Sequence, residues 1–338
     1  MSEWIKVAVD AMGGDNAPGE IVKGAVEAVR ANENVSVTLV GLQEQIEAVL
    51  ATCGEYPAER LSVRAASEVI ETGEPPVDAI RRKRDSSMVV GLKMVRSGEC
   101  DAFVTAGSSG AVLAGGQLLV KRIKGIERAA LAPILPSAKG PVILIDCGAN
   151  MDPRASQMVQ FAQMGSVYYE HMCGVKDPQV AIVNVGTEEE KGNALVKEVY
   201  PLLKACDSIN FTGNIEAREI PAGGAQVVVT DAFTGNAILK TYEGTASVLL
   251  HSIKDALMTD LRSKIGGLLI KPAVKGLMKK FDASEYGGAP LLGLTGLVVK
   301  THGNSTAKEI RGGIEQCILF KEKRVSEHLA KSMGLETE

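Results

Sequence analysis

The chain has 338 residues, which exceeds the size at which one compact core usually suffices, so we expect one large α/β unit with an appendage, or two lobes. Hydrophobic residues make up 45%, aromatic residues only 4%, and the net charge is −4, a balance that allows a large aliphatic core and argues against nucleic-acid binding. Six cysteines without a CxxC pair indicate free thiols in a reducing compartment rather than disulfides or a zinc site.

The first residues lead directly into an apolar strand, without the charged and apolar regions of a signal peptide. The sequence also lacks an apolar run of the roughly 20 residues that a membrane-spanning helix requires. We therefore expect a cytoplasmic protein that at most lies on a membrane surface.

Short aliphatic strands alternate with amphipathic helices along most of the chain. This alternation predicts a mainly parallel sheet with helices on both faces and right-handed crossovers. We expect a single catalytic α/β domain over residues 1–338. The predicted strands are 5–9, 35–40, 61–65, 102–105, 129–135, 142–145, 180–185, 209–212 and 227–230, and the predicted helices are about 18–31, 43–50, 88–98, 156–172 and 195–203, with a further one from 111.

Polar, glycine-containing turns follow six of these strands, beginning near residues 10, 107, 146, 184, 213 and 231. Parallel strands bring such turns to one edge of a sheet, so a single cleft is expected to gather them. The turn 107–110 lacks the lysine of a P-loop and the G-x-S-x-G elbow, and the turn 10–15 lacks the dinucleotide fingerprint. Asp10 and Asp15 serve equally well as helix caps in the alternative interpretation.

The turn 184–193, NVGTEEEKGN, joins a buried strand to a helix. Free N–H groups at a helix start favour anions, and Lys191 and Asn193 are placed to face one. A helix start rich in acidic residues, favoured by the helix dipole, is the alternative.

Two basic stretches stand out. Arg81, Arg82, Lys83 and Arg84 precede a helix that Asp85 to Ser87 would cap, and they either bind phosphate or an acidic partner or form a solvated face.

Residues 257–281 are the second basic stretch, with six basic residues, one acidic residue and apolar residues between them, and Pro272 is expected to divide them into two helices of a hairpin. Such helices lie on anionic membranes or against a partner subunit, and packing on the protein's own body is the alternative. The expected membrane contacts are Leu261, Ile265, Leu268, Leu269 and Lys271.

Nine motifs in chain order closely resemble those of the bacterial PlsX family, the phosphate acyltransferases of phospholipid synthesis. Ser109 and Ala232 stand where the family more often has Thr and Gly, and Ala232 would be strained at a positive φ. The motifs are DAMGGDNAP (10–18), RRKRDSS (81–87), AGSSGA (106–111), DCGAN (146–150), NVGTEEEKGN (184–193), GNIEAREIP (213–221), DAFTGN (231–236), YGGAPLLGL (286–294) and HGNS (302–305).

The resemblance implies a Rossmann-like α/β/α homodimer that acts near the membrane without metal or nucleotide cofactor. It further implies transfer of a long acyl chain from acyl carrier protein to inorganic phosphate, with the product passing to a membrane glycerol-3-phosphate acyltransferase. Lys191 and Asn236 match the family's catalytic positions. We expect substrate-binding residues in the same turns: Asp10, Gly13, Gly14, Asp15, Gly107, Ser108, Ser109, Asp146, Asn150, Asn184, Thr187, Asn193, Asp231, Thr234 and His302.

The chemistry of these residue types agrees with that reaction. A thioester is already activated, so the enzyme needs only to hold phosphate in line with the carbonyl carbon. Our hypothesis is that Lys191 binds phosphate and Asn236 supports the developing oxyanion. His302 is either structural or a proton shuttle for the leaving thiolate. The basic residues 81–84 are expected to steer the acidic carrier.

Other functions remain open at this point. A short-chain phosphotransacetylase is chemically close, and a dehydrogenase of the isocitrate type is disfavoured by the missing dinucleotide fingerprint and acidic metal cluster. A non-enzymatic membrane scaffold would not require polar turns at six strand ends.

Overall fold

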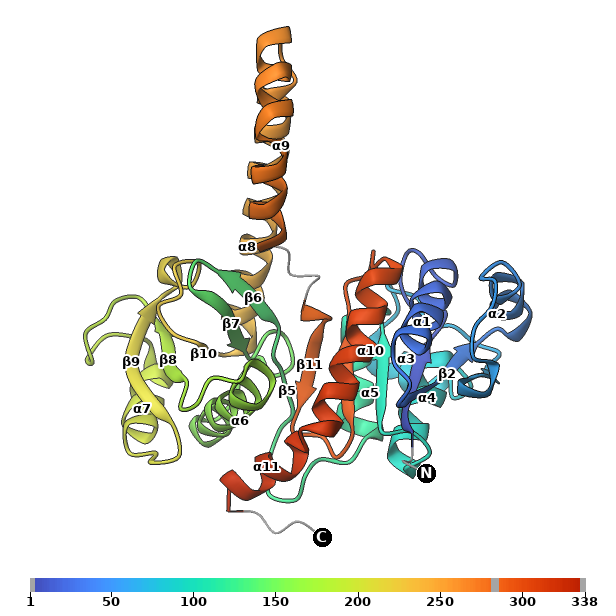
Figure 1. Ribbon diagram of the computed structural model, residues 1–338. Coiled ribbons are helices and arrows are strands. Elements are labelled where there is room, and N and C mark those ends of the chain that lie inside the picture. Colours follow the sequence, from blue (N-terminus) through green and yellow to red (C-terminus); the bar gives the residue numbers. More distant parts are fainter. Residues whose placement is uncertain (1–3, 281–285, 335–338) are drawn as a thin grey trace.

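The computed structural model describes residues 4–280 and 286–334 and contains two sheets, flanked by helices, with a helical hairpin rising between the two halves (Figure 1). The first sheet has seven strands in the order β3-β2-β1-β4-β12-β11-β5, and the second has five in the order β6-β7-β10-β8-β9. β11 runs antiparallel to both of its neighbours and β6 runs antiparallel to β7, whereas the other pairs are parallel.

The strands are β1 Ile5–Asp10, β2 Val35–Gly41, β3 Leu61–Ala65, β4 Ala102–Thr105, β5 Ala130–Leu131, β6 Ile134–Ser137, β7 Gly140–Ile145, β8 Gln179–Asn184, β9 Asn210–Glu216, β10 Val227–Val229, β11 Ala289–Leu292 and β12 Leu297–Lys300. The helices are α1 Gly19–Ala31, α2 Gln43–Leu50, α3 Pro76–Arg82, α4 Ser87–Ser97, α5 Ser109–Leu119, α6 Ala155–Cys173, α7 Ala194–Lys204, α8 Ala232–Leu257, α9 Leu261–Lys280, α10 Ala307–Glu322 and α11 Val325–Ser332.

Both faces of each sheet are covered by helices, which confirms the α/β/α layering. Successive strand residues point to opposite faces, so Val7 and Val9 pack with α1 and α10 while Ala8 packs with α4 and α5. In the second sheet, Ile145 packs with α6, and Leu144 faces the first turns of α8. The inner strands β1, β4, β7 and β10 are aliphatic and largely buried on both faces, as is typical of parallel strands, whereas the outer strands β3 and β9 are partly exposed.

The expectation of one sheet is wrong. The predicted strand 129–135 is interrupted at Pro133, so that β5 joins the first sheet and β6 the second. The two sheets meet there, because the N–H of Cys147 donates to the carbonyl oxygen of Leu131 at 2.9 Å. The strand ends are therefore divided between two adjacent sheets.

Three further elements differ from the prediction. Residues 213–216, expected as a turn, complete β9, where the ladder with β8 shifts register between Val180 and Ala181. Helix α3 and strand β12 were not predicted, because each is short. α3 begins at Pro76, whose fixed φ suits a first helical turn.

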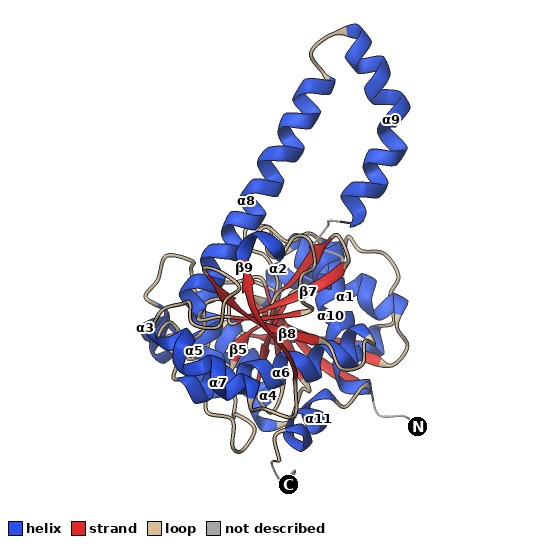
Figure 2. Ribbon diagram, turned by 90° about the vertical axis from the view of Figure 1, so that its left-hand side faces the viewer, coloured by secondary structure: helices blue, strands red, loops and turns tan. Residues whose placement is uncertain are grey.

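The hairpin consists of α8 and α9, which lie antiparallel and are joined at the tip (Figure 2). The break falls at residues 258–260, where Asp260 accepts a hydrogen bond from the N–H of Ser263 at 2.9 Å. The predicted division at Pro272 is wrong, since Pro272 lies inside α9. The carbonyl that loses its partner there lies on a helix exposed to water, which reduces the penalty. Phe281, the last residue of the predicted hairpin, lies outside the described residues.

No helix in the described ranges combines the length and the apolar character needed to cross a bilayer. The hairpin nevertheless exposes large apolar side chains over most of its length, including Leu261, Leu268 and Leu269, which are 74%, 70% and 77% exposed.

Candidate active site at the strand ends

Asp10 organises the strand ends of the first sheet. Its carboxylate is buried and accepts hydrogen bonds from Thr105 Oγ1 at 2.8 Å and from the N–H of Met12 at 3.2 Å. Thr105 Oγ1 in turn accepts from the N–H of Gly107 at 2.9 Å. Burial raises the pKa of Asp10, and its hydrogen bonds act in the opposite direction. Asp10 is therefore a structural acceptor that ties the turns after β1 and β4 together.

The glycines of these turns permit the close approach. A Cβ built on Gly13 would lie 2.6 Å from Asp10 Oδ2 and 2.7 Å from the N atom of Gly107. Gly14 has φ +96 and lies against the carbonyl of Gly303. The N–H of Asp15 donates to that carbonyl at 2.7 Å. The turn at 302–305 thus joins this edge.

Several predicted binding residues lie here in capping or exposed positions. Ser108 is buried and caps α5 by accepting from the N–H of Ala111 at 3.5 Å, and Ser109, the first residue of that helix, is exposed. Asp15 is also exposed. His302 is exposed and its Nδ1 lies 2.6 Å from Asn304 Oδ1, a local contact that fits a structural role.

Asp146 has a similar structural position where the two sheets meet. Its fully buried carboxylate accepts from the N–H groups of Leu131 and Ala149 at 2.9 and 3.2 Å, and from the N–H and Nδ2 of Asn150, both at 2.7 Å. Burial raises its pKa to about 6, against the effect of these hydrogen bonds. Asn150 Nδ2 also donates to the carbonyl of Ala129 at 2.8 Å. Both residues hold backbone in place.

A pocket of about 170 Å³ lies at the strand ends of the second sheet, between β8, β10 and the starts of α7 and α8. Asn193 caps α7 by accepting from the N–H of Val196 at 2.9 Å, and Asp231 caps α8 by accepting from the N–H of Thr234 at 2.9 Å. Two helix N-termini therefore adjoin the pocket, which favours an anion there. The predicted residues that line it are Asn184, Asn193, Asp231 and Thr234.

Lys191 lies beside this pocket and is not among its lining residues. Its Nζ forms an ion pair with Glu188 at 2.7 Å, and Glu188 raises the pKa of Lys191 above its ordinary value, so the lysine is charged at neutral pH. Asn184 fixes the turn by donating from Nδ2 to the carbonyl of Lys191 at 3.0 Å. Thr187 is exposed. Among the three glutamates, Glu188 pairs with Lys191 and Glu189 pairs with Lys204 at 2.8 Å.

Asn236 lies in the first turns of α8 with an exposed side chain. The turn before it is packed tightly, since a Cβ on Gly235 would come within 2.0 Å of the carbonyl oxygen of Asp146. Ala232 is a helical residue and is not among the positive-φ positions, so an alanine there is unstrained. Among the described residues, no hydrogen bond joins Asn236 to Lys191, and their cooperation remains a prediction.

Lys300, which sequence reasoning missed, ends β12 at the edge that carries Asp10. Its Nζ donates to the carbonyl oxygens of Ala106, at 3.4 Å, and of Thr301. Burial, and secondly the charge of Lys240, lower its pKa to about 8. The signal was available, because Leu297 to Lys300 is an aliphatic run followed by the polar turn 301–305.

The basic residues 81–84 form the end of α3 and the loop after it. Arg81, Arg82 and Arg84 are exposed, whereas Lys83 pairs with Glu74 at 2.6 Å and donates to the carbonyl of Val69 at 2.6 Å. The predicted cap of the following helix is confirmed at Ser86, which accepts from the N–H of Val89 at 3.4 Å.

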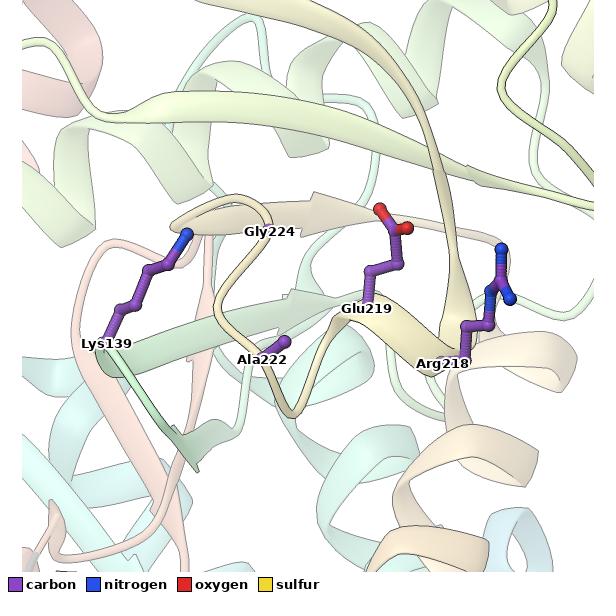
Figure 3. A pocket seen from close by; sticks show the side chains of 5 residues that line it. All are labelled: Lys139, Arg218, Glu219, Ala222 and Gly224. Atoms are coloured by element: carbon purple, nitrogen blue, oxygen red, sulfur yellow. The ribbon is translucent and has the colours of Figure 1, made fainter.

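A second, larger pocket of about 490 Å³ lies between Lys139 and the residues 218–224 that follow β9. Figure 3 shows Lys139 and Arg218 on opposite sides of it. Lys139 precedes β7, whereas Asp146 follows it, so this pocket adjoins the opposite end of that strand. We do not assign it to the site.

The fold and its strand ends define a two-sheet α/β protein whose polar turns meet a pocket at helix N-termini. Solved structures with this fold include a phosphotransacetylase from Streptococcus pyogenes, with a TM-score of 0.61 and 18% identity over 96% of this chain and 94% of the other. The EutD phosphotransacetylase from Staphylococcus aureus has a TM-score of 0.57 and 15% identity over 95% and 94%. At these identities the likeness concerns the fold alone.

Sequence relatives identify the family. A family model described as fatty acid synthesis protein matches residues 5–328. A phosphate acyltransferase from Clostridium botulinum is 48% identical over 97% of each chain, and one from Alkaliphilus oremlandii is 49% identical over 98% of each. The chain belongs to the PlsX family of phosphate acyltransferases, enzymes of fatty acid and phospholipid synthesis.

Proposed function

We propose that the chain transfers a long-chain acyl group from acyl carrier protein to inorganic phosphate, giving an acyl phosphate for phosphatidic acid synthesis. A phosphate oxygen attacks the thioester carbonyl carbon, the new C–O bond replaces the C–S bond, and the proton of hydrogen phosphate goes to the leaving thiolate. The observation that carries this proposal is the pocket bounded by the starts of α7 and α8, next to Lys191 and Asn236.

Lys191 and Asn236 have different roles in this proposal. Lys191 is charged and exposed, so it exchanges its ion pair with Glu188 for a contact with the phosphate. Water screens an exposed ion pair of this kind and leaves it weak, so a dianion competes with it readily. Asn236 donates its amide to the oxyanion that forms at the carbonyl.

Docking of the carrier is proposed at the exposed basic residues beside α3. Lys83 is already held by Glu74, which leaves Arg81, Arg82 and Arg84 as the steering charges. Rim charges of this kind raise the rate of association with an acidic partner and lose their effect in salt.

We propose that the hairpin mediates contact with an anionic membrane and with a second subunit of a homodimer. Leu261, Ile265, Leu268 and Leu269 are more than half exposed, and Lys271 is exposed near them. Contiguous apolar exposure of this kind is unusual on a monomer. In this proposal the protein is a cytoplasmic, peripherally membrane-associated enzyme, whose product passes to a membrane glycerol-3-phosphate acyltransferase.

The test is release of free carrier thiol from long-chain acyl carrier protein, followed with a thiol reagent with and without phosphate. Phosphate-dependent release is expected. No release above background would contradict the proposal. A preference for acetyl-CoA over the long-chain acyl carrier protein would instead indicate a short-chain phosphotransacetylase.

A further inference from the structure

The ammonium of Lys300 is partly buried at the strand ends of the first sheet. Lys300 pairs with Thr105 in the parallel ladder of β12 and β4, which places it at the strand ends beside the Asp10 network. Its Nζ donates to the backbone carbonyls of Ala106 and Thr301. Within the described ranges, no carboxylate lies within ion-pair distance of it.

The charged groups that face Lys300 come from three elements. Lys240 on α8 opposes its charge, and Asp10 and Asp15 after β1 favour it more weakly. Asp10 is turned toward Thr105 and backbone N–H groups, and Asp15 is exposed. Lys240 also pairs with Glu243 at 2.7 Å. Lys300 is partly buried and Lys240 is exposed, and their like charges repel, so an anion bound near both removes that repulsion.

The position of Lys240 ties this pair to the proposed reaction. Lys240 follows Asn236 by four residues in α8, so both side chains lie on one face of that helix, a turn apart. The same helix starts at Asp231 beside the pocket, while β12 comes from the other sheet. Lys300 therefore faces the helix of the proposed catalytic asparagine from across the junction of the two sheets.

We infer that Lys300 is a phosphate-binding catalytic residue, whose ammonium holds the nucleophilic phosphate from the first-sheet side, opposite Lys240 and Asn236. The inference rests on the proposed function and names a group of that same site. Lys300 and Lys191, which contacts the phosphate in the proposed function, supply two positive charges that match the dianionic charge of phosphate near neutral pH, and an ammonium acts on phosphate as a point charge. Anchoring from both sheets also fixes the attacking oxygen relative to the carbonyl carbon.

Binding should then depend on pH in a specific direction. Lys300 is charged below its pKa of about 8 and neutral above it. Phosphate affinity should therefore fall as pH rises from about 7 to about 9.5, while phosphate itself stays a dianion over most of that range. Arginine stays charged throughout, so Lys300→Arg should keep its affinity at the higher pH.

The experiment measures phosphate binding to the full chain directly, by ³¹P NMR line broadening, beside the KM for phosphate in the thiol-release assay. Lys300→Met should weaken phosphate binding by at least about tenfold and raise the KM for phosphate, with little change in the KM for acyl carrier protein. Lys323→Met, at the exposed end of α10, is the control and should match the wild type.

Wild-type phosphate affinity in a folded Lys300→Met variant would overturn the inference. If that variant does not fold, Lys300→Arg decides, because a loss of affinity near pH 8 equal to that of the wild type would also overturn it. The two proposals fail separately. Phosphate binding that depends on Lys300 without thiol release supports the anion site and contradicts the acyl donor, whereas normal transfer by Lys300→Met contradicts only the inference.

Discussion

The strand ends of the two sheets follow one sequence pattern and differ in what their polar groups do. In the first sheet, Asp10 and Ser108 are buried and their acceptors are occupied by backbone N–H groups or Thr105. In the second sheet, Asp146 is likewise buried, whereas Lys191 and Asn236 are exposed. Polar side chains in the turns after strands therefore hold the backbone in place at some positions and are accessible to a ligand at others.

The difference lies in burial rather than in residue type. A buried polar group whose partner is removed costs about 1–3 kcal/mol of stability, whereas an exposed one costs little. Substitutions at the buried turns should lower the free energy of unfolding, and substitutions at the exposed groups should lower activity alone. Lys300 is partly buried, so its substitution can affect both stability and phosphate binding, and its test needs a measurement of each.

The largest effect is expected at the exposed pair. Lys191→Ala and Asn236→Ala should each lower kcat by about 10²-fold or more, because each removes a charge or donor aimed at the transition state. Their unfolding curves should match the wild type. Lys204→Ala, which breaks the similar exposed ion pair with Glu189, is the matched control for Lys191. Acyl-phosphate formation by Lys191→Ala within about threefold of the wild type would show that the exposed lysine is not catalytic.

The next-largest effect is expected in stability, where a tightly packed glycine of α8 is compared with an unpacked glycine of the same helix. Gly235→Ala places a methyl group against the carbonyl of Asp146 and should destabilise the fold by about 2–3 kcal/mol, measured by urea denaturation. Gly244→Ala, in the same helix with no heavy atom near its added Cβ, should be neutral or stabilising by about 0.5–1 kcal/mol. Equal stability of the two variants would mean that the start of α8 is not tightly packed.

The hairpin extends the comparison to apolar groups. Replacing Leu268 and Leu269 by Asp should lower flotation with anionic vesicles by more than about tenfold, because it removes apolar area and adds repulsive charge. The unfolding curve should not change, since both side chains are largely exposed. Lys254→Gln on α8 tests the contribution of charge alone. Equal flotation of the leucine variant and the wild type would place these leucines against protein instead.

The smallest effect is expected at the basic loop. Reversing Arg81, Arg82 and Arg84 to Glu should raise the KM for acyl carrier protein several-fold at low salt, and the difference should shrink as salt rises. Lys83 is left unchanged because it pairs with Glu74. Kinetics that do not respond to salt in either protein would count against steering at this loop.

Local patterns predicted most strands and helices, because alternating aliphatic runs and caps such as Ser86 are short-range signals. They did not predict that Pro133 divides one apolar run between two sheets, because strand pairing is decided by distant residues. The predicted helix break at Pro272 was wrong because an exposed helix tolerates a lost backbone hydrogen bond.

The sequence predicted the types of residue in the candidate site better than it predicted which of these residues lie together. Asn184, Asn193, Asp231 and Thr234 do share a pocket, whereas Asp10, Asp146 and Asn150 proved to hold backbone. Nothing in the sequence separates a buried aspartate that accepts N–H donors from one that faces a ligand. Lys300 was missed because its strand is only four residues long and because its interest depends on Lys240, which lies on the distant helix α8.

Helix α8 runs without interruption from Asp231 at the site to Leu257 near the tip of the hairpin. At about 1.5 Å per residue, its last turn lies roughly 30 Å from Asn236, so the helix holds the tip of the hairpin at a fixed distance from that residue. The helix also fixes the direction in which each side chain of the hairpin points relative to Asn236, because each residue turns the helix by about 100°. Removing seven residues from each arm would shorten the distance between Asn236 and the tip and keep the apolar face of the hairpin pointing in the same direction. Removing two residues would turn that apolar face away.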